Sequence, residues 1–291
     1  MPIPDSSRGS GPVCYNSRVG TLFLVATPIG NLEDITLRAL RILGEASCIA
    51  AEDTRQTRKL LERYQIRVPL ISYHEHNKRA RLGDVLGRLT HGDVALVSDA
   101  GTPGLSDPGF ELVRAALEAG HLVQAIPGPS APIAALVASG LPTDAFVFVG
   151  YLPRRAAERR AGLQALVEER RTTLAFEVPH RLPQALADLE AVLGPERRLA
   201  VARELTKLHE EIFRGTVSAA RARFSAEPAR GEITLVIGGA TDAPAWDEAR
   251  VRAALREKER LGTPPSEAAR HVAQASGWPR RQVYRLAMER E

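Results

Sequence analysis

The sequence predicts an α/β protein of two domains with a helical segment at its C-terminal end. At 291 residues, 44% of them hydrophobic, the chain exceeds the usual single domain and can fill two cores. Short apolar runs alternate with segments of helical periodicity over residues 22–139, which is typical of a parallel sheet covered on both faces. After residue 146 fewer helices separate the apolar runs, which indicates a mixed or partly antiparallel second sheet.

Domain boundaries are expected where the composition changes. Residues 1–18 hold many Pro, Gly and Ser and little to bury, so we expect a disordered tail there. The first α/β domain is expected over residues 19–148 and the second over 149–240. A helical tail is expected over 241–291.

Five short apolar runs predict the strands of the first domain. They are residues 22–26, 48–51, 70–73, 94–97 and 122–126. A helix is expected after each of these strands. The first is expected at about 36–43, the second ends at about 63 and the third at 89. The fourth begins after 109, and the fifth ends at 139. At the fourth helix, Asp107-Pro108 is typical of a helix start, with Asp107 as N-cap and Pro108 in the first helical position.

Gly, Pro, acidic residues and His gather in the loops that follow these five strands. The richest loop is Ser98–Gly109, in which Gly101 and Gly104 let the backbone approach a ligand and adopt positive φ. Because loops after parallel strands share one edge of the sheet, they predict a single ligand cleft. The expected lining is Pro28, Asp53, His74, Asp99 and Ser130.

The second domain and the tail are predicted in the same way. Strands are expected at 146–150, 173–177, 199–202, 210–213 and 233–237, and helices at about 157–169 and 183–192. In the tail, helices at 266–275 and 280–288 flank the turn Ser276-Gly-Trp-Pro279. The second of them carries Arg280, Arg281, Tyr284 and Arg285, so the pair is either a helix-turn-helix nucleic-acid binder or an αα-hairpin packed on the body.

Charge and cysteine usage narrow the class of protein. The net charge of +4 is compatible with nucleic acid without requiring it. The basic side chains are nearly all Arg, so the four lysines are the more informative. Cys14 and Cys48 fit neither a metal site nor a disulfide framework. Without a membrane-length apolar run or a signal peptide, we expect a cytoplasmic protein.

Four loop motifs resemble those of the tetrapyrrole-methylase superfamily. They are Thr27-Pro-Ile-Gly-Asn31, Ala51-Glu-Asp-Thr-Arg55, Ser98-Asp-Ala-Gly-Thr-Pro103 and Pro127-Gly-Pro-Ser130. The resemblance is strongest to the branch of bacterial small-subunit rRNA (cytidine-2′-O-)methyltransferases, and it continues through Tyr73–Asn77, His180-Arg181 and Arg203–Lys207. Corrin- and sirohaem-forming members carry Gly-x-Gly-x-Gly-Asp after the first strand. The different first loop here therefore disfavours a tetrapyrrole substrate.

The resemblance implies an S-adenosylmethionine-dependent enzyme, with the cofactor in a cleft between two α/β domains. The implied substrate is the ribose 2′-hydroxyl of a decoding-region cytidine in the 16S rRNA of the small subunit, and the implied oligomer is a homodimer. The residues implied to bind the cofactor are Pro28, Ile29, Asp99, Ala100, Gly101, Thr102, Ser130, Ala131, Phe176, Leu205 and Thr234.

The chemistry of such a transfer suggests which side chains act. A methyl sulfonium is already activated, so alignment supplies most of the acceleration and no metal is needed. A ribose hydroxyl is a poor nucleophile, so a nearby base would help. The bases and orienters considered are Glu52, Asp53, His74, His76, Glu204 and Lys207, of which Glu52, Asp53 and Lys207 are assigned as catalytic. Asp53 is alternatively a helix N-cap, and Lys207 alternatively an ion-pair partner of Glu204.

RNA contacts are assigned to Arg55, His76, Asn77, Arg154 and Arg155. Arg55 can hold a phosphate bidentately or be an ordinary helix-surface residue. The run Arg154, Arg155, Arg159 and Arg160 can meet phosphates or form a solvated helix face. His74-Glu-His76 has alternating His residues but no third ligand cluster nearby in sequence, so no metal is predicted.

Two other functions remain open from the sequence. One is methylation of a tetrapyrrole or another small acceptor. The other is a non-catalytic RNA-binding α/β protein that has lost its ligand, against which the intact Asp99–Pro103 segment argues.

Overall fold

The computed structural model describes residues 20–227, 229–240, 247–276 and 278–288. It forms two compact units, Met1–Gly239 and Ala240–Glu291. The predicted disordered tail, residues 1–18, lies outside the described residues. Within the described part of the chain, no helix combines the length and the apolar character that crossing a membrane requires.

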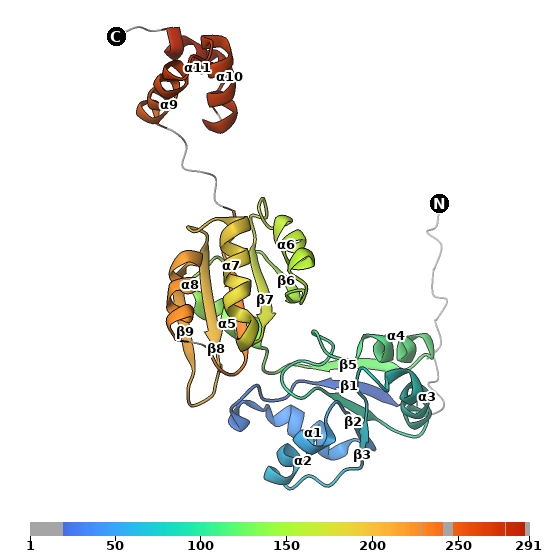
Figure 1. The fold of residues 1–291 in the computed structure, drawn as a ribbon. Coiled ribbons are helices and arrows are strands. Elements are labelled where there is room, and N and C mark those ends of the chain that lie inside the picture. The colour runs from blue at the N-terminus through green and yellow to red at the C-terminus, as the bar shows by residue number, and fades with distance from the viewer. Residues whose placement is uncertain (1–19, 228, 241–246, 277, 289–291) are drawn as a thin grey trace, which may run out of the picture. The chain divides into compact units, whose positions relative to one another are not determined.

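The first sheet contains five parallel strands in the order β3-β2-β4-β1-β5 (Figure 1). The strands are β1 Thr21–Val25, β2 Cys48–Ala51, β3 Leu70–Ser72, β4 Val94–Val97 and β5 Leu122–Ile126. The predicted parallel sheet is therefore confirmed. The strands β2 and β4 are buried at every residue, as expected of inner strands with helices on both faces.

Helices cover both faces of this sheet. Side chains of α1 (Leu37–Glu45) and α2 (Thr54–Arg63) pack on one face, and those of α3 (Lys78–Leu89) and α4 (Phe110–Glu118) on the other. A short 3-10 helix, Leu32–Asp34, precedes α1. The neighbouring strands β1 and β4 are thus followed by connections that run to opposite faces. A crevice opens for a ligand where two such loops diverge.

The predicted cap of α4 is wrong, although the helix expected after residue 109 is present. The helix begins at Phe110 with Gly109 at its N-cap, so Asp107 and Pro108 lie in the loop. The chain turns back before the helix, since Gly104 has φ +85° and Ser106 has φ +64°. A Cβ on Gly109 would lie 3.1 Å from the Leu96 side chain and 3.4 Å from the Gly104 backbone. This close return keeps Asp107 out of the helix.

The second sheet has the order β6-β7-β10-β8-β9, with β6 parallel to β7 and the other pairs antiparallel. This confirms the expected mixed sheet. Its strands are β6 Phe146–Tyr151, β7 Thr172–Glu177, β8 Arg198–Arg203, β9 Glu211–Thr216 and β10 Ile233–Ile237.

Four helices sandwich the second sheet. One face is covered by α6 (Ala156–Gln164), α7 (Leu182–Leu193) and α8 (Val217–Ala226), with the 3-10 helix Pro179–Arg181 before α7. The opposite face packs against α5 (Ala131–Ser139), although α5 follows β5 of the first sheet. Two differences from the prediction stand out: α6 ends at Gln164 rather than 169, and α8 was not predicted.

The unit Ala240–Glu291 contains three helices among its described residues, α9 Glu248–Arg260, α10 Pro265–Ser276 and α11 Arg280–Met288. The last two confirm the predicted pair. Helix α9 was not predicted from the sequence. Its buried residues in the small core are Val251 and Leu255, and charged residues surround them in the sequence.

Candidate active site

Backbone hydrogen bonds join the loops that follow β1, β4 and β5. The Thr27 N–H donates to the Gly101 carbonyl at 2.9 Å, and the Gly101 N–H donates back to Thr27 at 3.0 Å. The Thr102 hydroxyl donates to the Pro129 carbonyl at 3.2 Å. Because Gly101 has φ +83°, this two-way pairing uses a backbone conformation that favours glycine.

Asp99 ties the loop after β2 to this group. Its Oδ1 accepts the Asp53 N–H at 2.8 Å, and its own N–H donates to Glu52 Oε2 at 3.3 Å. Four strand-end loops are therefore hydrogen-bonded into one wall.

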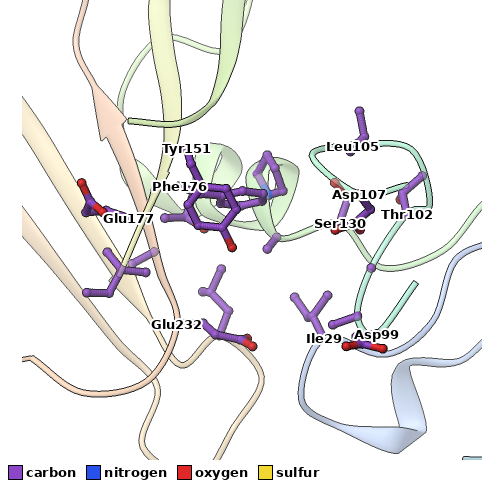
Figure 2. A pocket seen from close by; sticks show the side chains of 18 of the residues that line it. Ile29, Asp99, Thr102, Leu105, Asp107, Ser130, Tyr151, Phe176, Glu177 and Glu232 are labelled. Atoms are coloured by element: carbon purple, nitrogen blue, oxygen red, sulfur yellow. The ribbon is translucent and has the colours of Figure 1, made fainter. Parts of the chain in front are cut away.

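A cavity of about 320 Å³ lies between this wall and the second sheet (Figure 2). Ten of the eleven residues predicted to bind the cofactor line it: Ile29, Asp99, Ala100, Gly101, Thr102, Ser130, Ala131, Phe176, Leu205 and Thr234. Pro28 does not line it, and neither do Asp53 and His74 of the expected cleft. The cavity therefore keeps the predicted place at the strand ends but has a different lining.

The cavity is acidic. Among the described residues, its charged lining consists of five carboxylates and no Lys, Arg or His: Glu52, Asp99, Asp107, Glu177 and Glu232. Burial raises the pKa of Glu52, Asp99 and Glu177. Burial, reinforced by the charge of Glu52, raises the pKa of Asp107 to about 7. Such walls favour a cationic ligand over an anionic one.

The lining also offers an apolar surface and an unused polar group. Ile29, Phe176 and Leu205 supply apolar area, and Phe176 packs edge-on against Phe148 with ring centroids 5.1 Å apart. The buried Ser130 hydroxyl has no hydrogen-bond partner in the part of the chain that the structure describes. Because buried polar groups are normally satisfied, Ser130 marks a place for a ligand atom. These residues fit a cationic ligand with a flat apolar part, such as S-adenosylmethionine.

The two acidic residues assigned as catalytic differ in position. Glu52 lines the cavity, whereas Asp53 is the N-cap of α2 and accepts the Arg55 N–H at 2.8 Å. The Arg55 guanidinium also pairs with Asp53 at 2.7 Å. These bonds hold the pKa of Asp53 at about 2, which makes its carboxylate a weak base.

Lys207, the third assigned catalytic residue, lies outside the cavity lining and is ion-paired. Its Nζ contacts Glu204 at 2.9 Å and Glu232 at 3.1 Å. Glu204 also accepts the Glu232 N–H at 3.0 Å, and a Cβ on Gly30 would collide with the Lys207 stem. Lys207 therefore joins the Gly30 loop, which follows β1 of the first sheet, to segments of the second sheet.

We expect Lys207→Met to lower the free energy of unfolding by about 1–2 kcal/mol, because it strips Glu204 and Glu232 of their cation. Urea unfolding measures this, with Lys59→Met as control, since Lys59 is exposed on α2 and forms a hydrogen bond to Gln56. Lost methyl transfer with unchanged stability would contradict the ion-pair interpretation and support the catalytic one.

The residues assigned to RNA lie outside the cavity lining. Arg55 is 85% exposed and pairs with Asp53, while Arg154 and Arg155 are exposed. Asn77 is used within its own turn, since its Oδ1 accepts the His74 N–H at 2.8 Å. The His76 ring lies 6.0 Å from that of His74, centroid to centroid. RNA contact by these residues stays a prediction.

The basic run is not one surface. Arg159 is 3% exposed, and its Nε donates to Asp188 at 2.8 Å. Its Nη1 donates to the carbonyls of Pro153 and Arg154 at 3.1 and 3.2 Å. Arg159 therefore supports the segment that carries Arg154 rather than facing solvent.

Sequence reasoning missed several residues of the lining, above all Asp107, Tyr151, Glu177 and Glu232. Asp107 was in view but was interpreted as a helix cap. Glu177 ends β7, which is a usable signal, because a carboxylate at a strand end resembles the pattern of the first sheet. Among the described residues, no group of three or more His, Cys, Asp or Glu is placed to hold a metal ion.

Two family models match the chain. The model described as Tetrapyrrole (Corrin/Porphyrin) Methylases matches residues 21–221, and the model described as the RsmI C-terminal HTH domain matches residues 245–291. The second match favours the helix-turn-helix interpretation of the tail over the αα-hairpin.

Curated relatives match over nearly the whole chain. A "Ribosomal RNA small subunit methyltransferase I" of Synechocystis is 51% identical over 276 residues, covering 94% of this chain and 99% of that protein. The protein of the same name from Pseudomonas aeruginosa is 47% identical, covering 94% of this chain and 98% of that protein.

Solved structures share the fold at lower identity. A cobalt precorrin-4 methyltransferase has a TM-score of 0.59 at 16% identity, over 75% of this chain and 94% of that one. A uroporphyrin-III C-methyltransferase of Thermus thermophilus, solved with S-adenosylhomocysteine, has a TM-score of 0.53 at 22% identity, over 75% and 97%. The chain belongs to the tetrapyrrole (corrin/porphyrin) methylase family and, within it, to the ribosomal RNA small subunit methyltransferase I group.

Proposed function

We propose that this protein methylates the ribose 2′-hydroxyl of a decoding-region cytidine in 16S rRNA. Membership of the group makes it an S-adenosylmethionine-dependent rRNA methyltransferase. The observation that carries the proposal is the acidic cavity between the two sheets, within a chain 51% identical to a small-subunit rRNA methyltransferase. The cytidine and its 2′-oxygen rest on the resemblance of the loop motifs.

The lining residues divide the work of binding. S-adenosylmethionine supplies a methyl carbon activated on a sulfonium sulfur, which departs as the neutral thioether. The carboxylates favour that positive charge, and Phe176, Leu205 and Ile29 offer apolar area to the adenine. The Ser130 hydroxyl offers a hydrogen bond, and Gly101, which has no side chain, leaves space for the ligand beside it. Holding the acceptor in line with the methyl carbon is then the main catalytic task.

We expect the RNA backbone to remain outside the cavity, because its lining carries five carboxylates, of which, among the described residues, only Glu177 and Glu232 are paired with a cation, Arg181 and Lys207 respectively. We assign the phosphates to the exposed Arg55, Arg154 and Arg155, with only the target ribose entering. An acidic interior with arginines beyond its lining thus selects a single nucleoside from a polyanion.

We further propose a cytoplasmic homodimer. Large apolar side chains are exposed on α4, β5, α5 and β6, and a second copy of the chain would cover them. They are Phe110, Leu117, Leu122, Ile133, Val137, Phe146 and Val149. Sedimentation with Val137→Asp, which is expected to give monomers, tests this.

The decisive experiment follows a labelled methyl group from S-adenosylmethionine into small subunits, naked 16S rRNA and a corrin precursor in parallel. We expect label in RNA. Alkaline hydrolysis then locates it, because a 2′-O-methyl group blocks cleavage of the adjacent phosphodiester. Label in an alkali-resistant dinucleotide supports the ribose, whereas label in a mononucleotide indicates a base. Label in the corrin acceptor alone would overturn the proposal.

A further inference from the structure

Asp107 is one of the five cavity carboxylates, and the loop that carries it also reaches strand β6 of the second sheet. Figure 2 shows it beside Thr102, Leu105 and Ser130, with Tyr151, Phe176 and Glu177 on the other side. The positive φ of Ser106 and the close packing of Gly109 on Leu96 fix the loop on both sides of it. The backbone conformation of the loop therefore fixes the position of Asp107 at the cavity.

The same loop segment touches the second domain. The strand β6 has a bulge between Phe148 and Tyr151, and a Cβ on Gly150 would lie 3.0 Å from the Ser106 hydroxyl. Ser106, the residue before Asp107, therefore packs on this bulge, next to Tyr151. This is where the first domain's loop meets the second domain, beside the half-exposed ring of Tyr151.

Charged groups face Asp107 from three elements. Glu52 follows β2, Asp99 follows β4, and both repel its negative form, while the Ser98 hydroxyl donates a hydrogen bond to it. Tyr151 on β6 has its own pKa raised, first by burial and then by Asp107. Among the described residues, the groups that shift the pKa of Asp107 are Glu52, Asp99 and Ser98, and none of them is a cation. Burial and like charge therefore place its pKa at about 7.

We propose that Asp107 is the general base that removes the proton from the acceptor hydroxyl. This rests on the function proposed above. As the acceptor oxygen forms its bond to the methyl carbon, the carbon–sulfur bond breaks and the hydroxyl proton passes to a carboxylate oxygen of Asp107. Solvent at the cavity then removes that proton and restores the carboxylate.

The other acids of the loops suit this role less well. Glu52 is tied to the Asp99 N–H, and Asp53 is an N-cap bonded to Arg55. Lys207 carries a proton and pairs with two carboxylates. Asp107 combines a place at the junction of both domains with a proton affinity matched to neutral pH.

The test compares wild type with Asp107→Asn, Glu52→Gln and the surface control Asp84→Asn, since Asp84 pairs with Arg81 on α3 and lies outside the cavity lining. Asp107→Asn should lower kcat for rRNA by ~10²–10⁴-fold and remove an acidic limb near pH 7 from its pH profile. Calorimetry should show S-adenosylhomocysteine bound within a few-fold of wild type. Asp107→Glu, which keeps the carboxylate, should recover part of the rate.

Thermal unfolding gives a readout without catalysis. The folded pKa of Asp107 lies above the usual carboxyl value, so the folded protein holds an extra proton from about pH 4 to pH 7. Stability from this group is therefore lost as pH rises through 7. Asp107→Asn should melt higher than wild type at pH 8 and show a smaller difference at pH 5.

The outcomes separate the two proposals. Wild type that labels no RNA defeats both. Wild type that labels RNA with Asp107→Asn equally active overturns the base assignment alone. Loss of the pH limb in Glu52→Gln but not in Asp107→Asn would transfer the role to Glu52. We expect a normal rate in Asp84→Asn. This would show that the loss of activity in Asp107→Asn does not come merely from removing a carboxylate from the protein.

Discussion

Gly101→Arg is expected to abolish binding of S-adenosylmethionine while the protein still unfolds cooperatively. Gly101 lines the cavity, and a Cβ there would have only ordinary contacts, 3.4 Å from Ile29 and 3.8 Å from the Pro129 carbonyl. The first atom therefore fits, and the rest of an arginine must extend into the cavity. Its guanidinium would neutralise the carboxylates as well as fill space. We expect affinity to fall at least ~100-fold, or about 2.8 kcal/mol.

Gly104→Arg is the matched control for that loss. Gly104 lies in the same loop with φ +85°, close to the +83° of Gly101, but among the described residues nothing beyond its chain neighbours lies within 4 Å of an added Cβ. It does not line the cavity. Both variants bear the strain of a left-handed side chain, about 1–2 kcal/mol, so only obstruction differs. Calorimetry showing equal affinity in both variants would remove Gly101 from the binding site.

The first wall of the site was predictable because the information is local. Each strand of the first sheet is a short apolar run, and each ends in Gly, Pro or acidic residues at the edge where parallel strands end together. Asp99, Gly101 and Ser130 lie where that reasoning placed them. The N-cap alternative for Asp53 could also be predicted from the sequence, since an Asp before a helix commonly caps it.

The opposite wall depends on contacts between distant segments. Glu177 and Glu232 line the same cavity because β10 pairs antiparallel with β7, Ile233 lying opposite Glu177, and no short pattern encodes that pairing. α5 follows the first sheet in sequence yet packs on the second, which also escapes local periodicity. Asp107 shows a different failure. Asp-Pro does favour helix starts, but the packing of Gly109 on Leu96 delays the helix to Phe110.

A second large effect is expected at the buried ion pair that supports the segment after β6. Asp188→Ala should lower the free energy of unfolding by about 3–5 kcal/mol, measured in urea, because Arg159 stays buried without its carboxylate. Burial alone would raise the pKa of Asp188, but the hydrogen bonds from Arg160 and Arg159 lower it overall. The stabilisation is therefore present above the usual carboxyl pKa and is lost as pH falls through the lower folded value. The difference between wild type and variant should shrink in acid.

Two further variants show whether the burial or the charge matters. Arg160 also contacts Asp188 but is 58% exposed, so Arg160→Ala should cost less than about 1 kcal/mol. The double variant Arg159→Met with Asp188→Leu removes both buried charges and should be more stable than Asp188→Ala alone. It also releases the Pro153 and Arg154 carbonyls, which follow Tyr151 at the cavity. A stable double variant with impaired methyl transfer would mean that this pair positions the active site. Equal losses of stability in Asp188→Ala and Arg160→Ala would instead show that leaving the buried Arg159 without its carboxylate is not what destabilises Asp188→Ala.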